Sequence, residues 1–215
     1  MPKTNFANNE YYHIFNRGVD KREVFLDSYD LSRFFESMNE FNSLNPIGSI
    51  YENSFRKNHP GDATGKQKEK LVNFICYCLN PNHYHFLLEQ LTDRGIEKFM
   101  QRLGNGYTKY FNTKYKRSGV LFQGKYKAVH VDSNEYLLHL SIYINLNHQT
   151  HQLGHPMSKL SKSSWEEYLH SGKNIFCEKD IVLKQFKDIT EYEHFAENSL
   201  KDIRERKEME KLLLE

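Results

Sequence analysis

Several features are scarce or absent in this chain, and each absence narrows what the protein can be. No apolar run approaches the roughly 18 residues needed to cross a membrane. Residues 1–12 lack the apolar stretch that a signal peptide requires. The three cysteines are odd in number and form no C-x-x-C motif, so no disulfide framework is expected. These absences argue against a membrane partner and favour a cytoplasmic, reducing environment.

Aromatic side chains are abundant by contrast, with 15 Phe and 14 Tyr among 215 residues, enough to build a real core. The net charge of +2 says little by itself, but the charges are unevenly distributed. Residues 94–127 hold nine Lys or Arg against one acid, whereas residues 165–215 hold thirteen acids against nine Lys or Arg. The middle of the chain is therefore the part suited to bind a polyanion.

The order of predicted elements points to an α+β fold. Strand patterns and helix patterns alternate around an antiparallel hairpin, which is typical of a ferredoxin-like split βαβ sandwich. Strands are predicted near residues 11–18, 71–79, 83–90 and 119–131, and helices near 27–44, 95–115 and 133–148. Asp27 or Ser28 can cap the first helix and Asp132 the third, while residues 52–70 read as a polar loop. We assign residues 1–150 to a domain with this fold and 151–215 to a helical C-terminal extension.

His83 and His85 stand one residue apart in the segment NPNHYHFLLEQ. On a strand, positions two apart share a face, so both imidazoles project the same way while Tyr84 and Phe86 turn toward the core. Two imidazoles on one face can converge on a metal ion. A lone His-x-His pair is more often structural, so the hypothesis depends on a third ligand and a reacting group.

Tyr143 and Asn147 lie four residues apart in the third predicted helix and therefore share a face. If this helix crosses the face bearing His83 and His85, the Asn147 amide oxygen supplies a third ligand and Tyr143 lies beside the ion. A divalent ion with open positions acts as a Lewis acid on a phosphoryl group. The Tyr143 phenolate can then attack a phosphodiester and form a covalent phosphotyrosine. Taken singly, Tyr143 or Asn147 is more often a structural residue. Together with the two histidines, they predict a metal-assisted reaction at a phosphate.

The segments NPNHYHFLLEQ, LFQGKYKAV and YLLHLSIYINLNH, in this order, resemble the single-tyrosine HUH transposases, and in particular the REP-associated branch related to IS200-type elements. The resemblance implies a ferredoxin-like fold and a Mg²⁺ or Mn²⁺ ion held by His83 and His85, with Asn147 at the position of the polar ligand. It also implies Tyr143 as the nucleophile and single-stranded DNA, usually beside a hairpin, as the substrate. The implied activity is a metal-dependent strand transferase that cleaves and rejoins DNA through a 5′-phosphotyrosine.

The resemblance covers roughly residues 10–150 and has one notable departure. His148 stands where the family commonly has a proline, although the ligand and nucleophile positions are kept. The resemblance implies that the basic middle of the chain contacts DNA, because Lys and Arg contact phosphates and amide side chains bond to unpaired bases. The candidate DNA-binding residues are Arg17, Arg102, Lys109, Gln123, Lys125 and Lys127. For each, the alternative is an ordinary solvated surface position.

Three functions remain open on the sequence alone. The first is the DNA strand transferase. The second is a catalytically silent or domesticated DNA-binding protein, which keeps the basic surface while the metal site and Tyr143 stay idle. The third is a metal-dependent phosphodiesterase in which water is the nucleophile. A monomer and a homodimer are both compatible with the sequence, so Tyr143 can serve its own site or that of a partner copy.

Overall fold

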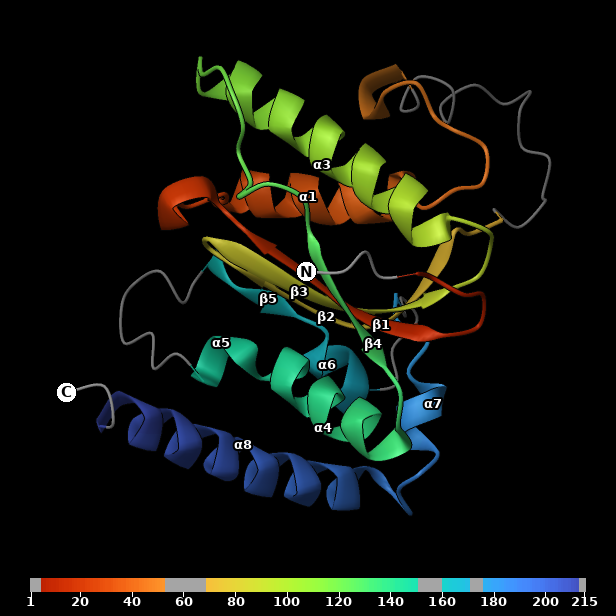
Figure 1. Cartoon of the computed structure of the whole chain (residues 1–215), viewed down its shortest axis with the longest axis vertical. Helices are drawn as coiled ribbons and strands as arrows, with labels where there is room; N and C mark the ends of the chain where they lie inside the picture. The colour runs from red at the N-terminus through yellow and green to blue at the C-terminus, as the bar shows by residue number, and fades with distance from the viewer. Residues whose placement is uncertain (1–4, 53–68, 151–159, 171–175, 213–215) are drawn as a thin grey trace.

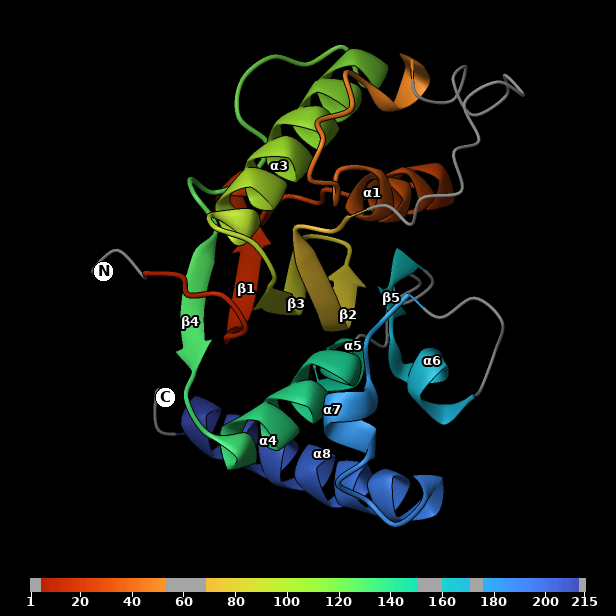
Figure 2. The same cartoon turned by 90° about the vertical axis from the view of Figure 1, so that its right-hand side faces the viewer.

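The structure is a computed structural model that describes residues 5–52, 69–150, 160–170 and 176–212. Figures 1 and 2 show a twisted antiparallel sheet with α1 and α3 on one face and α4 and α8 on the other. In chain order the elements are β1 (Tyr11–Arg17), a 3₁₀ turn (Val19–Lys21), α1 (Ser28–Glu40), β2 (Val72–Asn80), β3 (His83–Gln90), α3 (Gly95–Lys114), β4 (Lys127–Val131), α4 (Asn134–Asn145), α5 (Asn147–Thr150), β5 (Lys162–Ser163), α6 (Trp165–Leu169), α7 (Asp180–Leu183) and α8 (Ile189–Leu212).

The strand order β4-β1-β3-β2-β5, with every neighbouring pair antiparallel, confirms the predicted ferredoxin-like topology. The first four strands and the helices α1 and α3 follow the sequence β-α-β-β-α-β that defines this fold. The fifth strand comes from the region after residue 160 and extends the sheet beside β2. The predicted loop at 52–70 lies almost wholly outside the described residues.

The side chains of β3 alternate between two cores, as the sequence pattern predicts. Tyr84 and Phe86 are buried in the core beneath α1 and α3. Leu87 belongs to the opposite core, beneath α4, and His83 and His85 share its face of the strand. In the β1–β3 register, Phe15 pairs with His85 and His13 pairs with Leu87. The histidine pair therefore faces α4.

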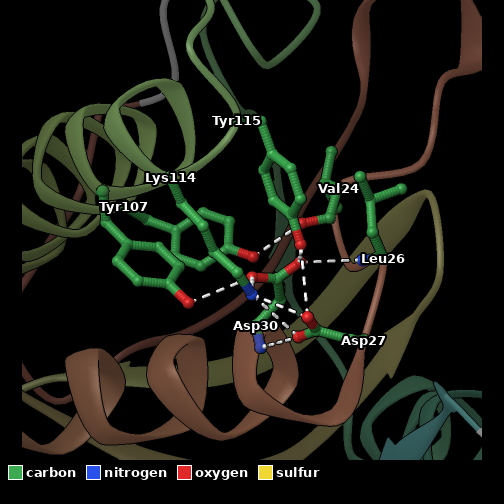
Figure 3. Close-up of polar contacts among 8 residues, drawn as sticks. Val24, Leu26, Asp27, Asp30, Tyr107, Lys114 and Tyr115 are labelled. Carbon is green, nitrogen blue, oxygen red and sulfur yellow. Dashed lines mark hydrogen bonds and ion pairs between the residues drawn. The ribbon is translucent and has the colours of Figure 1, made fainter.

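A buried polar cluster ties the start of α1 to the end of α3 (Figure 3). The Asp30 carboxylate is fully buried and accepts hydrogen bonds from Leu26 N at 2.9 Å and from the Tyr115 hydroxyl at 2.7 Å. It also accepts from the Tyr110 hydroxyl at 3.0 Å and from Lys114 Nζ at 2.7 Å. Lys114 belongs to the basic middle of the chain, so part of the positive charge of that segment is paired inside the fold.

The caps and ends of the helices depart from the sequence prediction in two places. Asp27 caps α1 by accepting from the Asp30 backbone N–H, as expected. The cap of α4 is Ser133, which accepts from Tyr136 N, so the assignment of Asp132 was wrong. The predicted helix 133–148 is also interrupted: α4 ends at Asn145, and α5 begins after one non-helical residue.

Most of the described region after residue 160 packs against α4 on the face of the sheet opposite α1 and α3, whereas Phe176 and Cys177 pack in the core beneath α1 and α3. Tyr168, Val182 and Tyr192 are buried in the same core as Leu140 and Ile142 of α4. The charged helix expected at the end of the chain is α8, which packs against α4 (Figure 2). The domain boundary at residue 150 stays a prediction. Among the described residues, no helix combines the length and apolarity needed to cross a membrane.

Candidate metal and nucleophile site

The structure brings His83 and Asn147 together at the end of the β2–β3 hairpin. His83 Nε2 lies 3.1 Å from Asn147 Oδ1, although 64 residues separate them in sequence. The Asn80 amide nitrogen lies 3.0 Å from His83 Nε2 and donates to Asn147 Oδ1 at 2.8 Å. Asn80 pairs with His83 across the hairpin, so strand pairing itself sets this contact. Two atoms of the predicted ligand set therefore lie side by side, both in contact with the Asn80 amide nitrogen.

The other nitrogen of the His83 ring defines its tautomer. His83 Nδ1 lies 2.6 Å from Asn82 Oδ1, which can only accept, so Nδ1 carries the hydrogen. In a neutral imidazole, Nε2 then presents a lone pair toward Asn147 Oδ1, which is also an acceptor. Two neighbouring ligands of an octahedral ion with bonds of about 2.1 Å stand about 3 Å apart. The 3.1 Å separation of these two atoms therefore fits a small divalent cation.

His85 is held by a residue that the sequence analysis did not identify, His13 on β1. His85 Nδ1 lies 2.9 Å from His13 Nε2, and both side chains are buried. Burial lowers the pKa of His13 to about 4, so its ring is neutral at neutral pH. The Phe15 ring stacks on His85 with centroids 5.6 Å apart. His13 contacts Nδ1 of His85, so Nε2 is the His85 ring nitrogen that remains as the candidate metal ligand.

Tyr143, on α4, lies over the rings of His85 and His13. Its ring centroid is 5.6 Å from that of His85 and 6.4 Å from that of His13, edge-on in both cases. Burial raises the pKa of Tyr143, and a side-chain hydrogen bond with Asn147 partly offsets this effect. The phenol is therefore protonated at neutral pH and needs activation to act as a nucleophile.

These groups face a cleft of about 830 Å³, which we call the histidine cleft. His83, His85 and Tyr143 line it, together with three of the predicted DNA-binding residues: Arg17, Gln123 and Lys127. The Arg17 guanidinium donates to the Gln123 side-chain oxygen, which joins the end of β1 to the segment before β4. Basic and amide groups from two segments thus surround the predicted reacting residues.

The remaining predicted DNA-binding residues lie elsewhere. Lys109 and Lys125 line a second cleft of about 750 Å³ between α3 and residues 119–126, which we call the helix cleft. Arg102 lines neither cleft, and its guanidinium donates from the middle of α3 to the carbonyl of Ser43, which follows α1. The structure therefore does not bring Arg102 together with the others.

His13, Asn80 and Asn82 are the polar contacts that sequence reasoning missed. The signal for His13 was present, because in the strand YYHIFNR it alternates with the core residues Tyr12 and Ile14. Its proximity to His85 depends on the register between β1 and β3, which the sequence pattern does not reveal. Asn80 and Asn82 flank a hairpin turn, where asparagine is common for reasons of backbone geometry alone.

Comparison with known proteins supports the resemblance inferred above. Residues 62–147 match the family model described as "Transposase IS200 like". This segment contains His83, His85, Tyr143 and Asn147, so the resemblance is confirmed for the part of the chain that holds them. A solved structure of a REP-associated tyrosine transposase bound to a REP hairpin is similar, with a TM-score of 0.48 and 10% identity, over 85% of this chain and 93% of that chain. No curated protein matches.

Proposed function

We propose that the protein is a DNA strand transferase that cleaves and rejoins single strands through Tyr143. The observation that carries this proposal is the convergence of His83 Nε2 and Asn147 Oδ1, 3.1 Å apart, beside the Tyr143 phenol. His85 completes the proposed ligand set from the same face of β3. The family match over residues 62–147 supports the class of reaction.

The proposed ligands are oriented by a second layer of side chains. His13 contacts Nδ1 of His85 and Asn82 contacts Nδ1 of His83, so each ring is oriented through Nδ1, and Nε2 is the proposed ligand atom of both. The donor set of two imidazoles and one amide oxygen suits Mg²⁺ or Mn²⁺. When bound, such an ion would polarise a phosphate oxygen of the DNA.

Tyr143 would carry the covalent step. Its phenol loses its proton, and the phenolate oxygen bonds to phosphorus while the bond from phosphorus to the 3′ oxygen of the upstream strand breaks. That 3′ oxygen takes up a proton and leaves as a hydroxyl. The downstream strand stays attached as a 5′-phosphotyrosine until a DNA 3′ hydroxyl displaces the tyrosine. The Asn147 side chain, which lowers the pKa of Tyr143, would favour the phenolate over the phenol.

The histidine cleft supports single-stranded or hairpin-flanked DNA as the partner. Arg17 and Lys127 can contact phosphates on either side of the reacting one, and Gln123 can bond to an unpaired base. Tyr143 and His85 belong to the same chain and lie side by side, which favours a site completed within one protomer. A homodimer is compatible with this arrangement but is not needed for it.

A cleavage assay tests the proposal. A labelled hairpin with a single-stranded extension is incubated with the protein and Mg²⁺ or Mn²⁺, then resolved on a denaturing gel. Tyr143→Phe is expected to abolish cleavage and keep DNA binding, whereas Tyr136→Phe, on the same helix but outside the histidine cleft, keeps both. Cleavage that persists in Tyr143→Phe would indicate that water is the nucleophile. Binding without cleavage by the unaltered protein would indicate a silent DNA-binding module.

A further inference from the structure

Gly104 lies in the middle of α3, where glycine destabilises a helix relative to alanine. A nearby glycine on the same helix has an evident packing reason. A Cβ at Gly106 would lie 2.6 Å from ring atoms of Phe41, so no side chain fits there. A Cβ at Gly104 would meet nothing within 4 Å. Packing therefore explains Gly106 but leaves Gly104 unexplained.

Gly104 lines the helix cleft between α3 and residues 119–126. The cleft combines apolar surface from Met100 and Phe122 with the amide and hydroxyl side chains of Asn105 and Thr108. The absence of a side chain at Gly104 keeps this surface open. Apolar surface bordered by hydrogen-bonding groups suits a planar ligand with polar edges.

The Tyr126 hydroxyl is a second, independent sign of a ligand. Tyr126 lines the helix cleft, and its hydroxyl oxygen is buried with no hydrogen-bond partner among the described residues. Buried hydroxyl groups are almost always paired with protein, ordered water or a ligand, so the Tyr126 hydroxyl can take a partner from outside this chain. Lys125, whose Nζ lies 5.4 Å from the Tyr126 ring centroid, adds positive charge.

The two clefts meet at the end of β1. Asn16 lines both of them, and its side-chain amide donates to the Gly124 carbonyl at 3.2 Å. Gln123 and Lys127 face the histidine cleft, whereas Lys125 faces the helix cleft. A single strand with a phosphate in the histidine cleft can therefore continue past Asn16 into the helix cleft.

We infer that the helix cleft binds an unpaired base of the single strand whose phosphate lies in the histidine cleft. The identity of the ligand as DNA rests on the proposed function. The base stacks on the aromatic and apolar surface beside Phe122, and Asn105 and the Tyr126 hydroxyl bond to its edge. Lys109 and Lys125 contact the flanking phosphates. Gly104 provides the space that the base occupies.

The test measures DNA affinity in a Tyr143→Phe background, so that cleavage does not intervene. Gly104→Met is expected to weaken binding of a labelled hairpin with a single-stranded extension about tenfold, the loss of roughly one stacked base. Binding of the same hairpin without an extension should not change. Thermal stability should be equal or higher, because methionine is the better helix former. Thr113→Met, exposed on α3 outside the cleft, is the matched control.

A second pair of variants keeps the inference falsifiable if Gly104→Met folds poorly. Tyr126→Phe removes the partnerless hydroxyl and should weaken binding of the extended hairpin severalfold. Gly104→Ala should raise stability and keep most of the affinity. Full affinity in both Gly104→Met and Tyr126→Phe would overturn the inference, even if the unaltered protein forms its DNA adduct. Failure of the unaltered protein to bind either hairpin would overturn the proposed function and the inference together.

Discussion

Two buried polar clusters lie on opposite faces of the same sheet, and they are built differently. Under α1 and α3, the Asp30 carboxylate is surrounded by donors, including Lys114 and two tyrosine hydroxyls (Figure 3). At the end of the β2–β3 hairpin, the acceptor atoms His83 Nε2 and Asn147 Oδ1, the latter at the start of α5, both contact the side-chain amide of Asn80. The buried carboxylate is neutralised within the protein, whereas the His83 and Asn147 acceptors are uncharged atoms that suit the cation proposed above. The difference separates a structural cluster from a candidate site.

The largest effect is expected when a proposed metal ligand is removed from the His83–Asn147 cluster. His83→Ala removes one proposed ligand and should lower metal-dependent cleavage at least about a thousandfold, because a ligand loss affects both binding and positioning of the ion. The unfolding temperature should change little. Treatment of the unaltered protein with EDTA should give the same loss and be reversed by added Mn²⁺. Unchanged cleavage in His83→Ala would remove the metal site from the account.

The donor-rich cluster should show the opposite behaviour. Asp30→Ala leaves Lys114 without its buried partner and should lower the free energy of unfolding by about 3 kcal/mol, measured by urea denaturation. This value lies at the lower end of the usual range because the Lys114 side chain is 29% exposed. Asp180→Ala breaks the exposed pair with Lys184 and should cost less than about 0.5 kcal/mol. Similar losses in both variants would contradict the structural role of Asp30.

A smaller effect is expected from His13, which we propose to position His85 rather than to touch the ion. His13→Phe removes the partner of His85 Nδ1 and should weaken Mn²⁺ binding about 10- to 100-fold in calorimetry. His13→Gln restores a hydrogen-bonding side chain and should recover part of the affinity. The ¹⁵N shifts of His85 in metal-free protein provide a second readout, because loss of the contact changes the tautomer population. Equal Mn²⁺ affinity in all three proteins would exclude this role.

The smallest effects concern the phosphate contacts at the edge of the histidine cleft. Lys127→Ala should weaken DNA binding severalfold, irrespective of sequence, and reduce the slope of log K against log salt concentration by about 0.7. Lys184→Ala, at an exposed position directly after α7, serves as the control. An unchanged salt slope in Lys127→Ala would show that this lysine makes no phosphate contact.

The fold was predictable because it depends on patterns that are local in sequence. The alternation in β3 separated Tyr84 and Phe86 from the histidines, and the strand and helix order identified the ferredoxin-like topology. The grouping of His83 with Tyr143 also followed from spacing and from family resemblance. These predictions needed no knowledge of which strands pair in which register.

The parts that escaped prediction depend on contacts between distant segments. His13 reaches His85 through the β1–β3 register, and Lys114 loses its apparent availability for DNA because it pairs with Asp30. Arg102 looked like its basic neighbours in sequence but donates to a backbone carbonyl in the segment that follows α1. A count of charges along the chain cannot separate side chains used in folding from those that line a cleft.

The most direct test of the central claim is the polarity of the covalent product. A hairpin-flanked single strand labelled at its 3′ end should shift to the size of a protein–DNA adduct in the presence of Mn²⁺, and mass spectrometry should locate the link at Tyr143. The same DNA labelled at its 5′ end should instead release a free fragment ending in a 3′ hydroxyl. Cleavage in which neither label becomes attached to protein would contradict the account, and so would an adduct that forms on Tyr143→Phe.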